Sequence, residues 1–151
     1  MPLLIALSGL VFNLLNTYLN WRYLTHFAPV DRYAGGWLSD PRFIVGTALF
    51  FCGLFINQHA DWVLMNLRKP GETGYKIPYG GLYRLVSCPN YLGELIEWIA
   101  WALLTWSLPG LVFAWWTAAN LIPRAVSHHR DYRRRFTDYP ARRRAIIPFL
   151  L

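Results

Sequence analysis

Polar side chains recur at helical spacing in or beside the apolar runs of this 151-residue chain. Asn57 and Asp61 are four residues apart, and Asn90 and Glu94 repeat that interval, so each pair lies on one face of a helix. Carboxylates are costly inside a membrane span and usually mark a functional site there. The alternative is that the first pair marks a helix leaving the bilayer, and that Asn90 caps a helix with Glu94 near its start. Glu97 fits this alternative less well, because it lies inside an apolar run.

The segment between these two polar stripes is basic and rich in glycine. It carries Arg68, Lys69 and Lys76 together with Gly71, Gly74, Gly80 and Gly81. Cations and freely exposed backbone N–H groups are the combination that a diphosphate needs. No GxGxxG follows a strand pattern, so the segment is not a Rossmann site. The sequence therefore predicts a pocket at a membrane surface for a large anionic ligand.

A third polar stripe lies in the strongly basic segment that follows the last long apolar run. Its members fall on one helical face: Arg124, His128, Tyr132 and Arg135. The eight arginines after residue 123 could simply contact lipid headgroups. A histidine and a tyrosine on the same face favour a more selective site.

The composition is that of a membrane protein, with 55% hydrophobic and 15% charged residues. The net charge of +7 is gathered at the ends of apolar runs, which favours anionic headgroups or a phosphate ligand over nucleic acid. No CxxC or HExxH spacing predicts a metal site, and Cys52 and Cys88 are expected to remain unpaired.

Apolar runs predict an all-α integral membrane bundle of about four transmembrane helices in one domain, residues 1–151. The runs cover 3–19, 43–56, 91–106 and 111–122, and the second must continue through the 57–67 stripe to span a bilayer. Asp40-Pro41 is typical of a helix start, and residues 107–110 predict a tight break. The first run lacks a basic flank and a clear cleavage site, so we expect a retained helix rather than a signal peptide.

Lysine and arginine counts predict the orientation of the bundle. Residues 20–42 carry three, the crossing at 66–90 carries four and the tail carries eight. With four spans, the crossing and the tail fall on one side, so the positive-inside rule places both, with the N-terminus, in the cytoplasm. The expected location is a bacterial inner membrane or the endoplasmic reticulum.

Three stretches of the chain closely resemble the steroid 5α-reductase family. They read LRKPGETGYKIPYGGLYRLVSCPNYLGELIEW, LLTWSLPG and HHRDYRRRFTDYPARRRAIIPF. The resemblance implies a membrane bundle that binds NADPH in a cytoplasm-facing cavity and transfers hydride to the β-carbon of an enone, typically in a Δ4-3-oxosteroid or similar apolar lipid. The family's cofactor-binding positions fall on Asn57, Asp61, Arg68, Tyr75, Asn90, Glu94, Arg124, His128, Tyr132 and Arg143.

The family also has further N-terminal helices, whose acidic and tyrosine side chains polarise the carbonyl group of the substrate. Nothing in this chain matches them, and residues 1–35 match the family poorly, so a short member or a fragment of a longer chain is expected. The carbonyl-polarising residues are therefore unassigned, with Glu94 as the candidate acid in this chain. Without them we expect weak NADPH binding and little enone reduction.

Two alternatives differ in function. Isoprenylcysteine carboxyl methyltransferases share a GxYRxxRHPxYxG pattern, which GLYRLVSCPNYLG approaches. Ser87-Cys88 replaces the Arg-His pair of that pattern, and His128-His129 stands where that family has paired acids in its tail. Both departures disfavour S-adenosylmethionine as the cofactor. The second alternative is a non-catalytic membrane subunit or remnant.

Overall fold

The computed structural model describes residues 3–151, which form helices joined by irregular segments. The long helices are α1 (Leu3–Arg22), α2 (Pro41–Met65), α3 (Pro89–Thr105) and α4 (Leu108–Arg135). A π-helical turn, Tyr23–Phe27, extends α1, and short 3-10 turns lie at Trp37–Ser39 and Gly81–Arg84. Within this described part there is no β-strand, only a single parallel bridge between Val86 and Arg144. The prediction of an all-α chain is confirmed.

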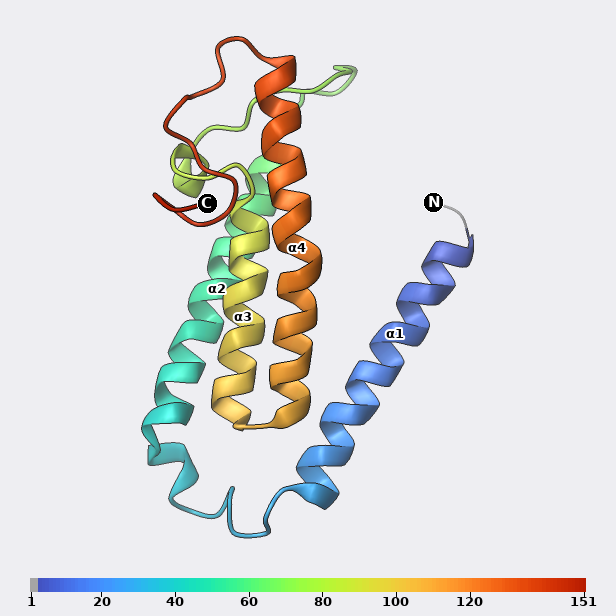
Figure 1. Cartoon of the computed structure of the whole chain (residues 1–151), viewed down its shortest axis with the longest axis vertical. Helices are drawn as coiled ribbons and strands as arrows, with labels where there is room; N and C mark the ends of the chain where they lie inside the picture. Colours follow the sequence, from blue (N-terminus) through green and yellow to red (C-terminus); the bar gives the residue numbers. More distant parts are fainter. Residues whose placement is uncertain (1–2) are drawn as a thin grey trace.

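Three of the helices form a bundle, and the fourth leans away from it. Figure 1 shows α2, α3 and α4 side by side, while α1 diverges from α4 towards its own N-terminal end. The stretches Leu3–Phe27 and Pro41–Met65 are long and apolar enough to cross a membrane, and little of either is buried within the chain. This surface is typical of helices that face lipid.

The ends of the helices follow the signals in the sequence. The Asp40 carboxylate accepts a hydrogen bond from the Arg42 backbone N–H at 2.8 Å, and Pro41 occupies the first helical position of α2. The α2 helix continues through the 57–65 stripe, as a full span requires. Between α3 and α4, Trp106 is left-handed at φ 46°, and the Ser107 hydroxyl accepts from the Gly110 N–H. The predicted break is therefore confirmed.

The fourth apolar run and the basic segment after it form one continuous helix, with Pro123 inside it. The 28 residues of α4 extend about 42 Å at 1.5 Å per residue, longer than the roughly 30 Å hydrocarbon core of a bilayer. Its basic half therefore projects beyond the apolar part of the bundle.

Glycines allow α2 and α3 to approach at backbone distance. A Cβ added at Gly93 of α3 would lie 2.5 Å from the Asn57 nitrogen and 2.7 Å from the Gly53 oxygen, both in α2. This contact sets the polar stripes of the two helices against each other.

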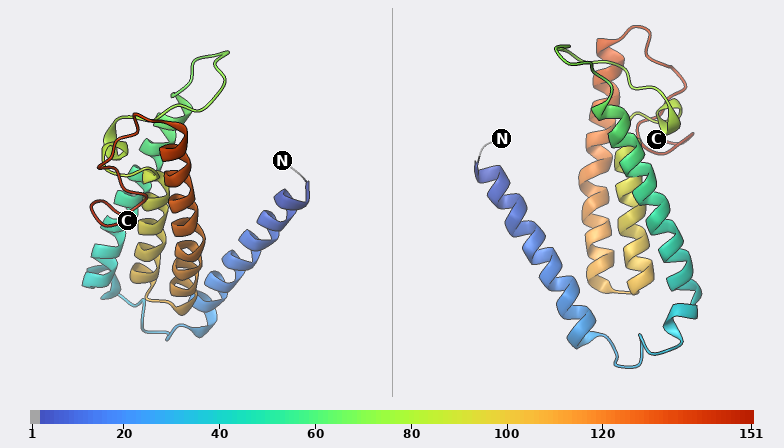
Figure 2. Two further views of the ribbon diagram at one scale, coloured as in Figure 1. Left: turned by 45° about the horizontal axis from the view of Figure 1, so that its top comes forward. Right: turned by 180° about the vertical axis from the view of Figure 1, so that it is seen from behind.

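The crossing and the tail gather at one end of the bundle (Figure 2). The Arg144 N–H donates to the Leu85 oxygen at 2.9 Å, and the Ser87 N–H donates to the Arg144 oxygen at 2.8 Å. The tail thereby lies against the start of α3. Cys88 is buried there and Cys52 is exposed, and both are free.

Candidate functional site

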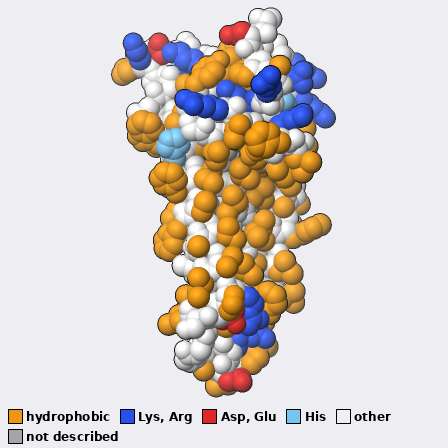
Figure 3. Space-filling model, turned by 90° about the vertical axis from the view of Figure 1, so that its left-hand side faces the viewer, with side chains coloured by type: hydrophobic (Ala, Val, Ile, Leu, Met, Phe, Trp, Pro, Cys, Tyr) orange, Lys and Arg blue, Asp and Glu red, His pale blue; other side chains and the backbone are white. Residues whose placement is uncertain are grey.

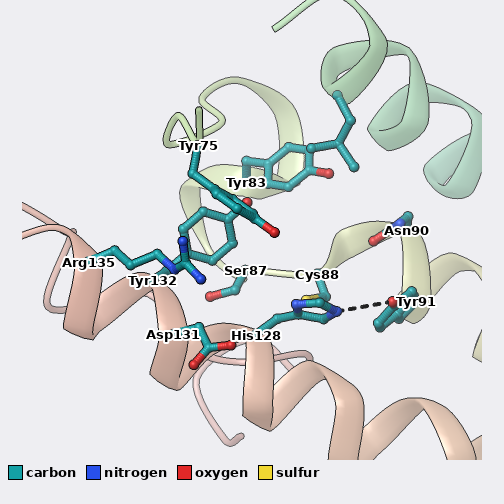
Figure 4. A pocket seen from close by; sticks show the side chains of 11 residues that line it. Tyr75, Tyr83, Ser87, Cys88, Asn90, Tyr91, His128, Asp131, Tyr132 and Arg135 are labelled. Carbon is teal, nitrogen blue, oxygen red and sulfur yellow. Dashed lines mark hydrogen bonds between the residues drawn. The ribbon is translucent and has the colours of Figure 1, made fainter. Parts of the chain in front are cut away.

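A cavity of about 300 Å³ opens where the end of α2, the crossing, the start of α3 and the basic half of α4 meet. Figure 4 shows that most of its walls carry polar or aromatic side chains. Four of the ten predicted cofactor-binding residues line it: Tyr75, Asn90, His128 and Tyr132. The other lining residues are Leu64, Tyr83, Ser87, Cys88, Tyr91, Asp131 and Arg135.

A second cavity of about 380 Å³ adjoins the first, since Leu64, Tyr75 and Tyr132 line both. It adds the predicted residue Arg68, together with Lys76. The crossing therefore contributes cations to one side of the combined space. The Arg135 guanidinium, which lies 4.4 Å from the centre of the Tyr75 ring, approaches from α4. A cation in contact with an aromatic face is favourable, so this contact holds the crossing against α4.

Asn90 connects the polar stripes of α2 and α3. The Asn57 side-chain amide donates to the Asn90 main-chain oxygen at 3.1 Å, and the Asn90 amide donates to the Asp61 carboxylate at 3.2 Å. Cys88, not Asn90, is the N-cap residue of α3. The capping interpretation of Asn90 is therefore wrong, because its side chain is engaged across the helix interface. Asn57 and Asp61 hold Asn90 in place from behind the cavity wall.

His128 contacts α3 across the first cavity. Its Nε2 lies 3.4 Å from the Tyr91 hydroxyl oxygen, the dashed contact in Figure 4. The histidine is exposed and its ring tilts against that of Tyr91, with centroids 6.0 Å apart. The tail stripe and the α3 stripe thus face the same space.

Five of the ten predicted residues line neither cavity: Asn57 and Asp61, which contact Asn90, and Glu94, Arg124 and Arg143. Glu94 is half-buried one helical turn beyond Asn90, and Arg124 is exposed near the middle of α4. One turn along a helix is about 5.4 Å, which is enough to leave a cavity at the helix end. Glu94 and Arg124 therefore lie further along the bundle than the cavities, and their assignment to the cofactor site stays a prediction.

Arg143 is only 2% exposed and lies behind the cavity wall. Its guanidinium carbon is 4.9 Å from the centre of the Tyr139 ring and 5.4 Å from that of Tyr79. Its Nη1 donates to the Tyr139 hydroxyl at 3.3 Å, whereas its Nε has no partner in the described part of the chain. Tyr139 in turn stacks on Tyr132, which lines both cavities. The buried positive charge of Arg143 is thus separated from the cavity by the stacked rings of Tyr139 and Tyr132.

A buried polar cluster around Ser87 has no counterpart among the sequence-predicted residues. The Ser87 hydroxyl oxygen lies 2.7 Å from His129 Nδ1 and 2.7 Å from the Tyr139 hydroxyl, and it donates to the Arg144 oxygen at 3.0 Å. These residues come from three segments that are far apart in the sequence, so no local spacing could reveal their contact. The cluster ties the end of the crossing, just before α3, to α4 and the tail.

The His129 cluster predicts a dependence of stability on pH. Burial, and then the charges of Arg133, Arg143 and Arg144, hold the pKa of His129 below its ordinary value of 6.5. Because the unfolded chain then binds a proton more readily than the folded one, stability falls as pH drops below about 6.5. We expect the melting temperature to fall on acidification from pH 7.5 to 5. Since the Ser87 hydroxyl proton is donated to the Arg144 oxygen, His129 Nδ1 donates to Ser87. The variant H129N keeps an N–H donor near that position but does not titrate, so its melting temperature should fall less.

The matched control is H26N, which changes a histidine of the exposed turn at the other end of the chain. It should retain the wild-type pH dependence. An H129N profile that parallels the wild type would show that the acid sensitivity arises elsewhere.

Among residues 3–151, no group of three His, Cys, Asp or Glu side chains could hold a metal ion. The cations around the cavities are Arg68, Lys76 and Arg135, and the one carboxylate in the lining is Asp131. This donor set suits an anionic organic ligand that carries both charged groups and ring systems.

Comparison with known proteins gives consistent matches over the whole chain. The family model for 3-oxo-5-alpha-steroid 4-dehydrogenase matches residues 1–151, including the first 35 residues, where the motifs gave no resemblance. The chain is 51% identical over 151 residues to the 3-oxo-5-alpha-steroid 4-dehydrogenase 1 of Bos taurus, covering 100% of this chain and 58% of the relative. It is 49% identical over 150 residues to the steroid 5-alpha-reductase DET2 of Solanum lycopersicum, with 99% and 57% covered. The 3-oxo-5-alpha-steroid 4-dehydrogenase 2 of Homo sapiens is 48% identical over 149 residues, with 99% and 58% covered. The chain thus spans a little more than half the length of these relatives.

Proposed function

We propose, since the chain belongs to the 3-oxo-5-alpha-steroid 4-dehydrogenase family, that it forms the NADPH-binding part of a membrane reductase. The reaction would reduce a carbon–carbon double bond conjugated to a carbonyl in a steroid-like apolar lipid, as the names of the relatives suggest. The observation that carries the proposal is the pair of adjoining cavities with Arg68 and Lys76 on one side and Asn90, His128 and Tyr132 on the other.

The residues around these cavities fit NADPH in charge and in kind. Three cations suit phosphate groups, and the Tyr75 and Tyr132 rings offer faces for planar groups. The buried Arg143 supports the same assignment, because none of the ion pairs among residues 3–151 neutralises it and its Nε is unpartnered. An anion in the cavity would offset that charge across the stacked rings of Tyr139 and Tyr132.

Each part of the site would do a separate task. When bound, NADPH supplies the hydride that adds to the β-carbon of the enone. Arg68 and Lys76 would bind phosphate, and Asn90, held by Asn57 and Asp61, would orient the cofactor by hydrogen bonding. Since Glu94 lies outside both cavities, polarisation of the carbonyl is proposed for groups in the part of the relatives that this chain does not cover.

We propose four membrane spans, with the crossing and the tail on the cytoplasmic side. Figure 3 supports this arrangement, since most of the visible lysines and arginines gather at one end of the molecule above a broad hydrophobic band, and a smaller group lies at the opposite end. The only charged residues among the 17 of α3 are Glu94 and Glu97, which lie within one helical turn of each other. The first half of α4 is largely apolar. The α3 helix lies alongside α2, which is apolar enough to span by itself, and α4 lies alongside α3.

Cofactor binding tests the proposal against its two alternatives. The purified chain in phosphatidylcholine nanodiscs is titrated with NADPH and, separately, with S-adenosylmethionine by calorimetry. We expect saturable binding of NADPH alone. Binding of S-adenosylmethionine alone would favour the methyltransferase alternative, and binding of neither would favour a non-catalytic subunit. Either result would overturn the proposal.

A further inference from the structure

The last residues of the chain turn back from the basic end of the bundle towards its apolar part. Ile146 is fully buried in a cluster with Leu95 of α3 and Leu121 of α4. Leu95 lies six residues, or about 9 Å, into α3, and Leu121 precedes the basic half of α4. Ile146 is therefore level with the apolar runs. Figures 1 and 2 agree with this placement, since the C-terminal end lies beside α2 and α3, well below the tip of α4.

Beyond Ile146 the side chains are apolar, and the last three of them are exposed. Phe149 is 81% exposed and Leu150 is 75% exposed. Residues 145–151 are termed the C-terminal hook below. Apolar side chains that are left outside the protein core at this depth would meet lipid in a membrane-embedded chain, and that contact removes them from water.

The backbone of the hook closes on itself. The N–H groups of Ile146 and Ile147 donate to the Leu151 main-chain oxygen at 2.8 and 2.7 Å, and those of Leu150 and Leu151 donate to the Ile147 oxygen at 3.2 and 3.1 Å. Pro148 has no N–H to satisfy. Pairing backbone groups within the protein lowers the cost of placing an irregular segment at a membrane, and this segment pairs four of its six N–H groups.

Charge marks the side of the hook that would face water. Arg142 and Arg144 directly precede the hook and are exposed. On α2, Phe55 is 72% exposed and Trp62 is 59% exposed, so this helix also presents an apolar surface. Arginines above an apolar surface are the arrangement that binds anionic headgroups over an acyl layer.

We infer that the C-terminal hook inserts into the headgroup–acyl boundary of an anionic bilayer, through Phe149 and Leu150 with Arg142 and Arg144 at the headgroups. The hook would anchor the tail, and with it the buried Arg143, over the start of α3. This inference rests on the proposed membrane placement of the bundle, but not on its proposed catalytic activity.

Nitroxide labelling of the full chain tests the depth of the hook. The C52A background removes the exposed native thiol, whereas burial raises the pKa of the Cys88 thiol to about 12 and keeps it unreactive. The added variants are L150C in the hook, F55C on the apolar surface of α2 and E72C in the exposed crossing. Each is labelled in nanodiscs of phosphatidylcholine with phosphatidylglycerol. Collisions are then measured with oxygen, which enters the membrane, and with a water-soluble nickel chelate.

We expect the label at position 150 to collide with oxygen and with the nickel chelate at rates similar to those of the label at position 55. Its nickel collisions should be several-fold fewer than those at position 72. Nickel collisions at position 150 equal to those at position 72, with position 55 protected, would overturn the hook and leave the membrane placement standing. Nickel access at position 55 as well would overturn the placement itself, and the hook with it. Leu150 is exposed, so L150C should leave folding intact.

Discussion

Replacing Arg68 with alanine is expected to weaken NADPH binding by about ten- to hundred-fold. Arg68 lines the cavity that also holds Lys76 and Gly74, and its side chain is exposed to that space. A charge-assisted hydrogen bond to phosphate contributes about 1.5–3 kcal/mol, which sets the size of the effect. Calorimetric titration of the wild type and R68A in identical nanodiscs measures it.

The matched control is R84A, which removes an exposed arginine from the same crossing. Arg84 lies on the 3-10 turn and lines neither cavity, so R84A should bind NADPH as the wild type does. The affinity lost in R68A should also shrink as salt rises, since an exposed charge is screened. Equal affinities of R68A and the wild type would remove Arg68 from the cofactor site.

The sequence was sufficient for features that depend on near neighbours. The helix start at Asp40 and the break at residues 107–110 follow from local side-chain and backbone chemistry, and both are present. Asn57, Asp61 and Asn90 could be placed on helix faces from four-residue spacing, and those faces do meet. Local chemistry and helical geometry determine these features, so they can be predicted from a single sequence.

Features that depend on distant neighbours could not be predicted. Ser87 contacts His129 and Tyr139 across 42 and 52 residues, and spacing says nothing about such pairs. Spacing also gives the face of a side chain but not its level along the bundle, which is why Glu94 shares a face with Asn90 but lies outside the cavities. The burial of Arg143 likewise depends on aromatic rings from separate segments.

Replacing Gly93 with alanine is expected to destabilise the bundle and weaken NADPH binding together. The added Cβ would lie 2.5 Å from the Asn57 nitrogen and 2.7 Å from the Gly53 oxygen, and neither backbone atom can move without displacing α2. Overpacking of this kind typically costs about 1–3 kcal/mol, which lowers the melting temperature of a chain this size by about 2–12 °C. Moving α2 also strains the hydrogen bond from Asn57 to Asn90, which holds a cavity residue in place.

The control substitution is G9A in α1, where an added Cβ meets nothing within 4 Å. Alanine is a better helix former than glycine, so G9A should leave the melting temperature unchanged or slightly raised. Thermal melts and NADPH titrations of both variants in one lipid separate the effects. The contact that holds α2 and α3 together also positions Asn90, so stability and NADPH affinity should fall together in G93A. Lowered stability with full NADPH affinity would show that the cavity does not depend on the α2–α3 approach. Unchanged stability would show that the helices have room for the methyl group.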